Sequence, residues 1–391
     1  MYIVVLGALV ALGPFTIDLY LPAFPVIQSE LGITTAAVQL TLTATTIGFG
    51  LGQLIVGPWS DRVGRRLPLI VASVVHVLAS VGVAFAPDLV WIAVFRVLQG
   101  VGAAAGGVVA MALVRDLFGG QKLVRMLSRL ALVTGLAPII APLIGSQLLL
   151  VIDWRGVFLF LAAYGVLVAL AAVFFVDETL TGERRADAGH DTMLARYRSI
   201  FRDRVFVGVA LIGGMSFSGL FAYLSASPFL FQELFGLDAQ QYGFLFAVNS
   251  FGIVLGTQVS ARLARRIGPQ WILAGATTVT FSASVAIVVL SAAGAGLFGV
   301  LVPLWFFITA VGFMLPMVQV LALVNHAREA GTAASVLGAL NFGLAGLISP
   351  LVGVFGVSGV VMGSVMAGTA LVAVLSVWLV VRPRSVPALA H

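Results

Sequence analysis

Two charged residues stand alone in long apolar stretches, and their side chains are the ones best suited to carry chemistry. Asp18 lies in the run 1–29 and Arg96 lies in the run 89–114, and neither run holds a second charge. A charge in a membrane span is costly, so it should face the bundle interior and find a partner. Burial favours the neutral form of a carboxyl group, whereas a nearby guanidinium favours the charged form. Asp18 with Arg96 is therefore predicted to bind and release a proton.

The elements that would position these two residues are membrane-spanning helices. Only 9% of the 391 residues are charged and 61% are hydrophobic, against about 25% charged in average soluble chains. A span needs roughly 20 apolar residues. Two long apolar segments, 267–325 and 330–381, must each fold back once, near 294–296 and near 356–359. Eight further segments are each sized for one span, which predicts an all-α protein with twelve transmembrane helices: 1–29, 31–60, 67–87, 89–114, 130–152, 156–176, 205–232 and 239–261.

The basic residues predict the orientation of these spans. Of the 21 lysines and arginines, 19 lie in alternate connections or the tail, and the opposite connections hold mainly acids. Basic connections face the cytoplasm, so both termini are expected there, in a bacterial cytoplasmic (inner) membrane. The same sorting accounts for the net charge of +6 without nucleic-acid binding. The first span lacks a basic segment before it and a cleavage site, so we expect it to be retained.

The longest polar stretch divides the chain into two halves. We expect an N-terminal six-helix bundle over 1–176, a cytoplasmic linker over 177–204, and a C-terminal six-helix bundle over 205–391. Within the linker, LARYRSIFRDR favours an amphipathic surface helix. The halves show weak similarity, including Gln39 and Gln241 at a common offset. Two such halves around a central cavity are typical of one class of transporters.

The sequence GPWSDRVGRR follows the second predicted span. Its glycines permit a tight turn, and the Asp61 carboxylate can pair with an arginine or with helix amides. The stretch resembles the hallmark loop of the major facilitator superfamily, G-x-x-x-D-R-x-G-R-[KR]. The resemblance implies a conformational gate, and the alternative is a basic turn that only sets topology. The matching residues are Gly57, Asp61, Arg62, Gly64, Arg65 and Arg66.

The fourth predicted span contains FRVLQGVGAAAGG. Arg96 and Gln99 are spaced i, i+3 on one helix face, and the small residues allow a neighbouring helix to approach closely. This resembles the R-x-x-Q-G-x-G-A pattern of the same superfamily. The alternative is that Arg96 lies near the outer membrane edge and reaches toward water.

The fifth predicted span reads GLAPIIAPLIGS, and its prolines should bend the helix along one face. It resembles the antiporter motif G-x-x-x-G-P-x-x-G-G, although Ala141 and Ser146 replace two glycines. The matching helix residues are Gly135, Pro138, Pro142 and Gly145. Together with TIDLYLPAFP and DWRGVF, these motifs make the chain similar to the Bcr/CflA branch of drug:proton antiporters, across essentially its whole length.

The remaining polar and aromatic residues of the spans are candidates for substrate binding. Aromatic rings suit lipophilic drugs, whereas amides can either bind a substrate or join helices. His76 stands alone in the third span and favours packing or a local hydrogen bond, with proton relay as the alternative. The candidates are Tyr20, Gln39, Phe217, Phe221, Tyr223, Asn249, Gln319 and Asn341.

The resemblance implies a proton-coupled efflux antiporter that exports amphipathic antibiotics or other drugs by alternating access. The alternative is a proton-coupled importer or exporter of one metabolite. The sequence shows no clustered catalytic residues of the kind that would indicate an enzyme, and no repeated pore-lining segment that would indicate a channel. It also lacks a nucleotide-binding loop that would indicate direct use of ATP. We therefore expect no metal and no cofactor other than the coupling proton. The expected partners are a lipophilic small molecule, protons and membrane lipid, for a protein that can work as a monomer.

Overall fold

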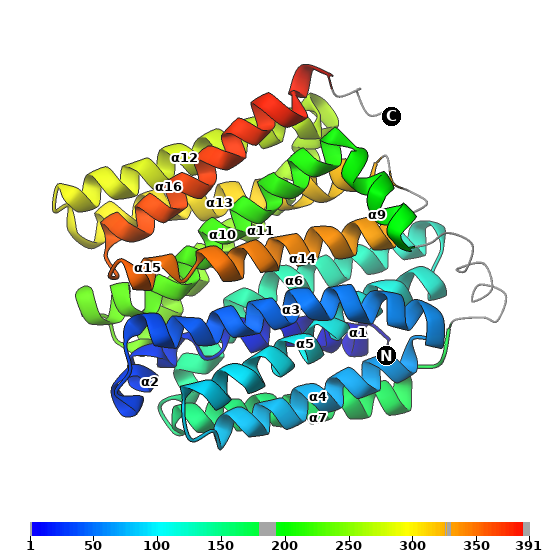
Figure 1. Ribbon diagram of the computed structural model, residues 1–391, viewed down its shortest axis with the longest axis horizontal. Coiled ribbons are helices and arrows are strands. Elements are labelled where there is room, and N and C mark those ends of the chain that lie inside the picture. Colours follow the sequence, from blue (N-terminus) through cyan, green and yellow to red (C-terminus); the bar gives the residue numbers. More distant parts are fainter. Residues whose placement is uncertain (1, 180–192, 325, 327–329, 386–391) are drawn as a thin grey trace. The chain divides into compact units, whose positions relative to one another are not determined.

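The computed structural model describes residues 2–179, 193–324, 326 and 330–385, and within these ranges every regular element is helical (Figure 1). Twelve of the described helical segments are long and apolar enough to cross a membrane. The predicted all-α polytopic fold is therefore confirmed for the described residues. Much of the predicted linker, 180–192, lies outside them.

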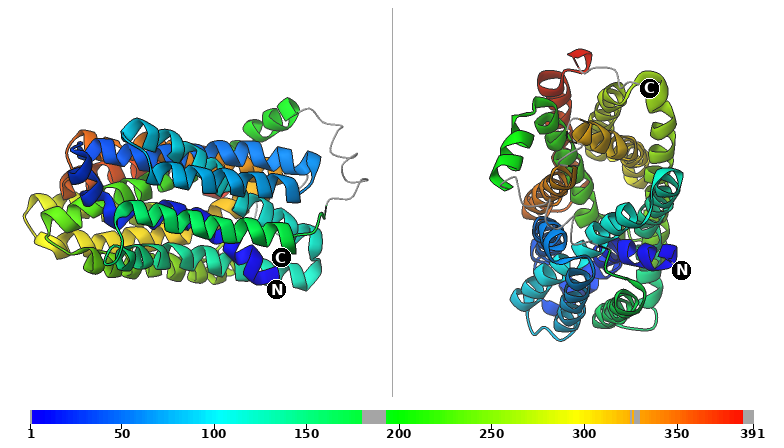
Figure 2. Two further views of the ribbon diagram at one scale, coloured as in Figure 1. Left: turned by 90° about the horizontal axis from the view of Figure 1, so that it is seen from below. Right: turned by 90° about the vertical axis from the view of Figure 1, so that its right-hand side faces the viewer.

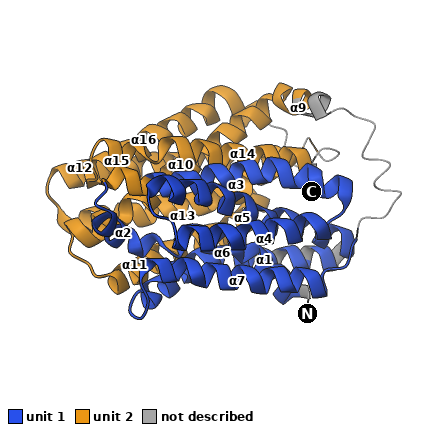
Figure 3. Cartoon of the chain, turned by 60° about the horizontal axis from the view of Figure 1, so that its bottom comes forward, with its two compact units in different colours: residues 1–33, 40–192 blue, residues 34–39, 193–391 orange. Residues whose placement is uncertain are grey.

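The chain forms two compact units, which are coloured separately in Figure 3. Unit 1 holds residues 1–33 and 40–192, and unit 2 holds 34–39 and 193–391. The division at 192 falls inside the stretch predicted as the linker, but 34–39, expected in the first half, group with unit 2. The helices up to the division are α1 (Tyr2–Asp18), a 3-10 turn (Leu21–Ala23), α2 (Phe24–Leu31), α3 (Thr35–Val63), α4 (Arg66–Ala84), α5 (Leu89–Leu117), α6 (Gly120–Leu148) and α7 (Trp154–Phe175).

Unit 2 begins its helices with α9, the segment in which we predicted an amphipathic helix. Ile200 of α9 is buried in the core of the unit, while Arg198 and Arg202 are exposed. The helices are α9 (Met193–Arg202), α10 (Arg204–Pro228), a π-helical turn (Phe229–Leu234), α11 (Ala239–Ile267), α12 (Pro269–Ala292), α13 (Gly296–Leu323), α14 (Ala330–Ile348), α15 (Leu351–Val354), α16 (Gly359–Leu375), a second π-helical turn (Ser376–Val381) and a 3-10 turn (Pro383–Ser385).

Acids at the helix starts account for several boundaries. Asp88, Asp153, Asp203 and Asp238 are the N-caps of α5, α7, α10 and α11, and each carboxylate accepts a bond from an amide of the first turn. Such a cap satisfies a backbone donor that has no partner within the helix. Gln241 completes a capping box with Asp238, so its offset from Gln39 does not reflect a shared role.

The two predicted fold-backs are confirmed. Gly294 and Gly296 separate α12 from α13 with φ of +70° and +67°, and Gly356 precedes α16 with φ of +88°. A left-handed backbone costs glycine little and strains other residues. These turns therefore occur where the sequence supplies glycine.

The first span is divided rather than continuous. α1 ends at Asp18, the 3-10 turn Leu21–Ala23 follows, and α2 resumes at Phe24. Pro22 has no amide to donate to the Asp18 carbonyl, so the regular helical ladder cannot continue across this point. We call residues 18–20 the α1 break.

Close helix contacts in unit 1 depend on glycine. A Cβ on Gly48 of α3 would lie 2.0 Å from the Val97 carbonyl oxygen, and a Cβ on Gly100 of α5 would lie 2.2 Å from the Thr45 carbonyl oxygen. The two helices thus meet at reciprocal glycines, as predicted for the small residues after Arg96. α4 packs against α5 and α7, while α1 packs against α5, α6 and α7.

Unit 2 is organised around α10, which packs against α13, α14 and α16, while α12 packs against α13 and α16. In the right-hand view of Figure 2 most helices within each unit are seen nearly end-on, as expected for spans that run side by side. Large apolar side chains such as Phe174 and Phe244 are 72% and 69% exposed. Exposed apolar side chains of this kind are compatible with contact with lipid.

Candidate functional site

Asp18 is the last residue of α1, and its carboxylate lies inside unit 1. The residue is 5% exposed, and the structure shows no hydrogen bond or ion pair from the carboxylate to a described residue. A buried carboxylate without a partner is unfavourable when charged and is acceptable when protonated. The position at the α1 break is therefore suited to a group that gains and loses a proton.

Arg96 is fully buried in α5, so the alternative that it reaches the membrane edge is wrong. Its Nη1 donates to the Thr16 carbonyl oxygen at 3.0 Å and to Gln99 Oε1 at 2.6 Å. The guanidinium carbon also lies 4.0 Å from the centroid of the Tyr20 ring, which is a cation–π contact. Arg96 thus contacts Thr16, two residues before the α1 break, and Tyr20, the last residue of the break.

No ion pair joins Arg96 to Asp18 among the described contacts. The guanidinium is instead held by the backbone and the Tyr20 ring, and Nη2 has no hydrogen-bond partner in the described structure. The predicted pairing of the two charges is absent from this conformation and stays a prediction for another one. Tyr20, which we placed among the substrate-binding residues, is 1% exposed and bonds Thr41 Oγ1 through its hydroxyl at 3.1 Å.

The predicted conformational gate centres on Arg65, at the turn between α3 and α4. Its guanidinium contacts the Asp61 carboxylate one helical turn away, and its Nε donates to Asp116 Oδ2 at 3.0 Å. Burial lowers the pKa of Arg65, but the hydrogen bonds to the two carboxylates outweigh it and raise the pKa above its usual value. The cation is thus shared between the ends of α3 and α5. Thr179, after α7, donates to Asp116 Oδ2 at 3.0 Å.

Glu178, just after α7, caps the start of α4. Its Oε1 accepts from the Arg65 amide at 3.0 Å and its Oε2 accepts from the Arg66 amide at 3.3 Å. A carboxylate at a helix N-terminus satisfies free amides and complements the helix dipole. Gly64 provides the turn with φ of +111°.

The other gate residues are placed as follows. Arg66 Nη2 donates to the Val173 carbonyl oxygen of α7 at 2.6 Å, and the Gly57 carbonyl accepts from Ser60 Oγ at 2.9 Å. Arg62 is exposed. The structure therefore brings Arg65 and Arg66, but not Arg62, into contact with α5 and α7.

The antiporter-motif residues lie on α6, which runs through Pro138 and Pro142 without interruption. A Cβ on Gly145 would lie 1.8 Å from the Leu19 carbonyl oxygen. Gly145 thereby allows the α1 break to pack directly on α6. Gly135 is partly exposed.

The substrate-binding candidates of unit 2 form two groups. Phe217 and Phe221 of α10 contact Phe342 of α14, with ring centroids 5.4 and 6.0 Å from it. Asn341, beside Phe342, is buried, and its Oδ1 has no partner among the described residues. Asn341 Oδ1 faces Gly213 of α10, where a Cβ would lie 2.8 Å from it. The aromatic group offers ring surface of the kind that lines sites for lipophilic compounds.

The second group joins Asn249 Nδ2 to the Tyr223 hydroxyl at 3.4 Å. Gln39 is grouped with unit 2, and its Nε2 donates to the Ser225 carbonyl oxygen at 2.9 Å. Gln319 is exposed on α13, and no described contact joins it to either group. Among the eight substrate candidates, the described contacts thus join Phe217 with Phe221 and Tyr223 with Asn249. Tyr20 and Gln39 bond to other residues.

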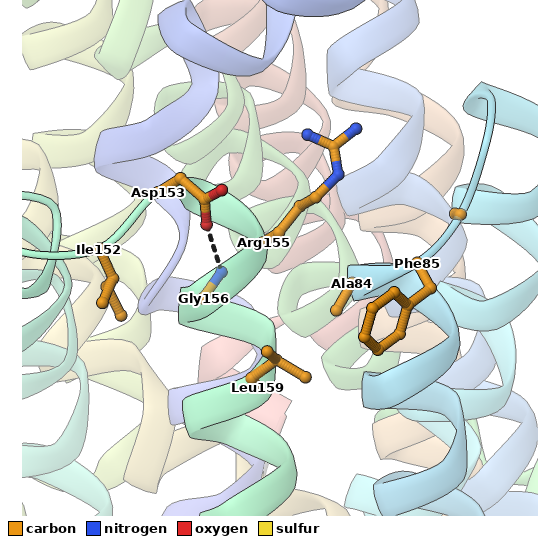
Figure 4. Close-up of a pocket in the computed structure, with 8 residues that line it drawn as sticks. Ala84, Phe85, Ile152, Asp153, Arg155, Gly156 and Leu159 are labelled. Atoms are coloured by element: carbon orange, nitrogen blue, oxygen red, sulfur yellow. Dashed lines mark hydrogen bonds between the residues drawn. The ribbon is translucent and has the colours of Figure 1, made fainter.

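A surface hollow of about 530 Å³ lies between the end of α4 and the start of α7. Figure 4 shows Phe85 on one side of it and Ile152 on the other. Nearby, Glu30 accepts from Trp154 Nε1 at 2.7 Å and forms an ion pair with Arg155. The hollow shares no lining residue with the Asp18–Arg96 site, so we treat it as separate.

Several site residues were not singled out from the sequence. Asp116 follows Arg115 at the end of the fourth span, where its acid could have signalled a partner for the gate. The roles of Glu178 and Phe342 depend on contacts between distant helices, and the sequence shows no spacing that predicts them.

Comparison with protein families decides the class of protein. The family model described as Major Facilitator Superfamily matches residues 5–350. The chain belongs to the major facilitator superfamily. Among superfamily relatives, an uncharacterized MFS-type transporter, YdgK, of Bacillus subtilis is 34% identical over 97% of this chain and 95% of its own length. The loop at 57–66 and the stretch around Arg96, which resemble superfamily motifs, therefore lie in a chain that belongs to the superfamily.

Two further relatives of this major facilitator chain carry functional names. A bicyclomycin resistance protein homolog of Haemophilus influenzae is 27% identical and covers 90% of this chain and 88% of its own. The multidrug resistance protein MdtL of Vibrio parahaemolyticus is 32% identical and covers 85% and 83%. These relatives support the resemblance to the Bcr/CflA branch.

Solved major facilitator structures share the fold. A partially occluded inward-open conformation of the xylose transporter XylE from E. coli superimposes with a TM-score of 0.75, covering 99% of this chain and 98% of its own at 14% identity. A bacterial homolog of the human lysosomal transporter Spinster gives 0.68 at 15% identity, covering 98% and 94%. At this level of identity the likeness concerns the fold alone.

Proposed function

We propose that this major facilitator transporter is a proton-coupled antiporter that exports lipophilic or amphipathic small molecules, antibiotics among them, from the bacterial cytoplasm. The observation that carries the proposal is the buried Asp18 carboxylate at the α1 break, which has no described partner, while Arg96 is held by the Thr16 carbonyl two residues before it. The names of the bicyclomycin-resistance and multidrug-resistance relatives support export of drugs.

The proposed cycle uses one carboxyl group and needs no covalent step. Protonated Asp18 is neutral and stable in its buried position, whereas opening to the cytoplasm exposes the group to water and favours release of the proton. Release leaves a carboxylate that the Arg96 guanidinium can stabilise once it leaves the Thr16 carbonyl. Entry of a proton from outside resets the transporter. Proton import thereby drives drug export by alternating access.

The aromatic group on α10 and α14 is the proposed contact surface for the drug. Phe217, Phe221 and Phe342 offer ring faces. A surface of rings with few polar atoms tolerates many chemical types. Such tolerance favours drug export over selective transport of one polar metabolite, which is the alternative function.

The test is a growth-inhibition panel in an efflux-deficient bacterium that produces the protein. We expect raised resistance to several unrelated lipophilic antibiotics, and lower resistance when Phe342 is replaced by Ala in protein of equal abundance. Resistance to none of the panel, together with proton-dependent uptake of a sugar or amino acid, would favour the metabolite alternative. Inverted vesicles then give the direction of movement.

A further inference from the structure

His76 of α4 is a buried polar residue that the proposed cycle does not use. It is fully buried, and its Nε2 lies 2.9 Å from Thr16 Oγ1. Thr16 belongs to α1 and stands two residues before Asp18. The contact therefore ties the third span to the segment that carries the proposed proton site.

The hydrogen bonds of Thr16 determine which His76 nitrogen carries the proton. Thr16 Oγ1 donates its only hydrogen to the Leu12 carbonyl oxygen at 2.6 Å. It must therefore accept from His76, whose Nε2 carries the hydrogen. Nδ1 has no partner among the described residues, so a proton there would be a buried donor without an acceptor.

Two glycines form the space that holds the imidazole. A Cβ on Gly165 of α7 would lie 2.9 Å from Nδ1, and a Cβ on Gly102 of α5 would lie 2.8 Å from the His76 Cβ. Gly165 thus brings α7 against the Nδ1 edge of the ring, and Gly102 brings α5 against the Cβ from which the ring extends. The close approach of α7 leaves little space beside Nδ1 for a new partner.

His76 also closes a circuit of hydrogen bonds around Arg96. The His76 carbonyl accepts from Ser80 Oγ at 2.7 Å, and Ser80 Oγ accepts from Gln99 Nε2 at 2.7 Å. Gln99 Oε1 accepts from Arg96 Nη1, which also donates to the Thr16 carbonyl. The Thr16 hydroxyl accepts from His76 Nε2, which closes the circuit.

The helices packed on His76 bring few titratable groups to this region. Apart from Arg115 and Asp116 at the end of α5 and Arg155 at the start of α7, these are Asp18 at the end of α1, Tyr20 just after it, Arg96 on α5 and Tyr164 on α7. The Tyr164 hydroxyl donates to the Ala8 carbonyl oxygen at 2.7 Å. None of them accepts a proton from Nδ1 among the described contacts. The positive charge of Arg96 further opposes a second positive charge on the ring.

We propose that His76 is a neutral positioning residue: its Nε2–H fixes Thr16, and through Thr16 it holds the Arg96 guanidinium beside the α1 break. The proposal rests on the proposed function, in which Arg96 influences the proton affinity of Asp18. If the donor is lost, the Thr16 hydroxyl keeps only its bond to the Leu12 carbonyl. The segment before the α1 break is then held less firmly, and Arg96 can move relative to the carboxylate. His76 then alters proton coupling without carrying the proton.

The decisive measurement does not require transport. In full-length protein with His190, His326 and His391 replaced by Gln, 15N spectra of labelled histidine report the single remaining ring. We expect the neutral form with hydrogen on Nε2, unchanged between pH 8 and pH 5. A ring that becomes doubly protonated in that range, or that carries its hydrogen on Nδ1, would overturn the proposal.

The second arm compares variants by the pH profile of ethidium movement into inverted vesicles. His76→Leu removes the donor, and we expect a shift of about one pH unit in the half-maximal rate, a tenfold change in apparent proton affinity. His76→Gln keeps an Nε2–H donor and should restore the profile. The matched control is Ser73→Ala, also buried on α4, whose hydroxyl bonds only within its own helix.

The two arms separate this proposal from the proposed function. If His76→Leu and His76→Gln shift the profile equally, or neither shifts it, the positioning role is wrong. If the unchanged protein moves neither ethidium nor any antibiotic of the panel, the proposed function is wrong. The histidine spectra still determine the protonation state of the His76 ring.

Discussion

Gly64 and Glu178 occupy one small space at the start of α4. A Cβ on Gly64 would lie 2.1 Å from Glu178 Oε2, and Gly64 has φ of +111°. The carboxylate caps two amides there, so it cannot move away without leaving them unpaired. At this residue the superfamily motif has a local physical reason: only glycine leaves room for the cap.

Gly64→Ala should therefore destabilise the turn between α3 and α4 in two ways, through backbone strain and through loss of the Glu178 cap. We expect destabilisation of about 1–3 kcal/mol, measured as a lower melting temperature in detergent. Adding Glu178→Ala should relieve the contact but not the strain, giving less than additive loss. Gly107→Ala is the control, because a Cβ there meets nothing within 4 Å. Equal stability of Gly64→Ala and Gly107→Ala would contradict this account.

The chemistry-bearing residues were predictable from the sequence, but their partners were not. Asp18 and Arg96 stand out because charges are rare in the spans, and Arg65 stands out through its motif. Arg96, however, is held by the Thr16 carbonyl and the Tyr20 ring. These partners are available only because the helix breaks after Asp18, which a sequence pattern does not place to the residue.

At the scale of elements, α6 and the α1 break form one joint. The Leu19 carbonyl fits against Gly145, and Arg96 holds the break from α5. Gly145 of the antiporter motif thus allows α6 to pack closely against the backbone next to the proposed proton site. The prolines of the same motif lie within a continuous helix.

Gly145→Ala should displace the α1 break, because its Cβ would meet the Leu19 carbonyl oxygen at 1.8 Å. Backbone atoms cannot give way as the end of a side chain can. We expect loss of drug export with the protein still inserted, measured as growth inhibition at equal protein abundance. Full resistance in the Gly145→Ala strain, matching that of Gly107→Ala, would show that close packing of α6 on the α1 break is not required for export.

Element boundaries followed the sequence where one residue type determines them. The fold-backs at Gly294–Gly296 and Gly356 were placed by glycine, and the caps at Asp88, Asp153 and Asp238 coincide with acids that we used as markers of topology. The division of the first span and the grouping of residues 34–39 with unit 2 were not predicted. The grouping of 34–39 depends on packing between segments far apart in sequence. The division of the first span has a local cause in Pro22, which we did not use to place a break.

At the scale of the whole molecule, the count of twelve spans follows from the spacing of charges, and the orientation in the membrane remains a prediction from the arginines. The chain has no cysteine, so single cysteines can report the orientation without background. Ser385 and Phe85 are exposed positions on connections predicted to face opposite sides.

Ser385→Cys should react with a membrane-impermeant maleimide in inverted vesicles but not in intact cells. Phe85→Cys should show the opposite pattern, because the loop after α4 is predicted to face outward. The cysteine-free chain is the control for labelling of other proteins. The reversed pattern would show that the orientation, and the direction of the proposed proton flow with it, is wrong. Labelling of both positions from the same side would contradict their placement on opposite sides of the membrane.

The central claim, that Asp18 carries the coupling proton, is tested most directly by Asp18→Asn in inverted vesicles under an imposed pH gradient. The measured quantity is gradient-driven accumulation of an antibiotic to which the panel shows resistance. Asp88→Asn is the matched control, since an asparagine can still cap α5. We predict that Asp18→Asn reduces accumulation to that of vesicles lacking the protein, while Asp88→Asn retains it. Accumulation by Asp18→Asn at the rate of the unchanged protein would contradict the account.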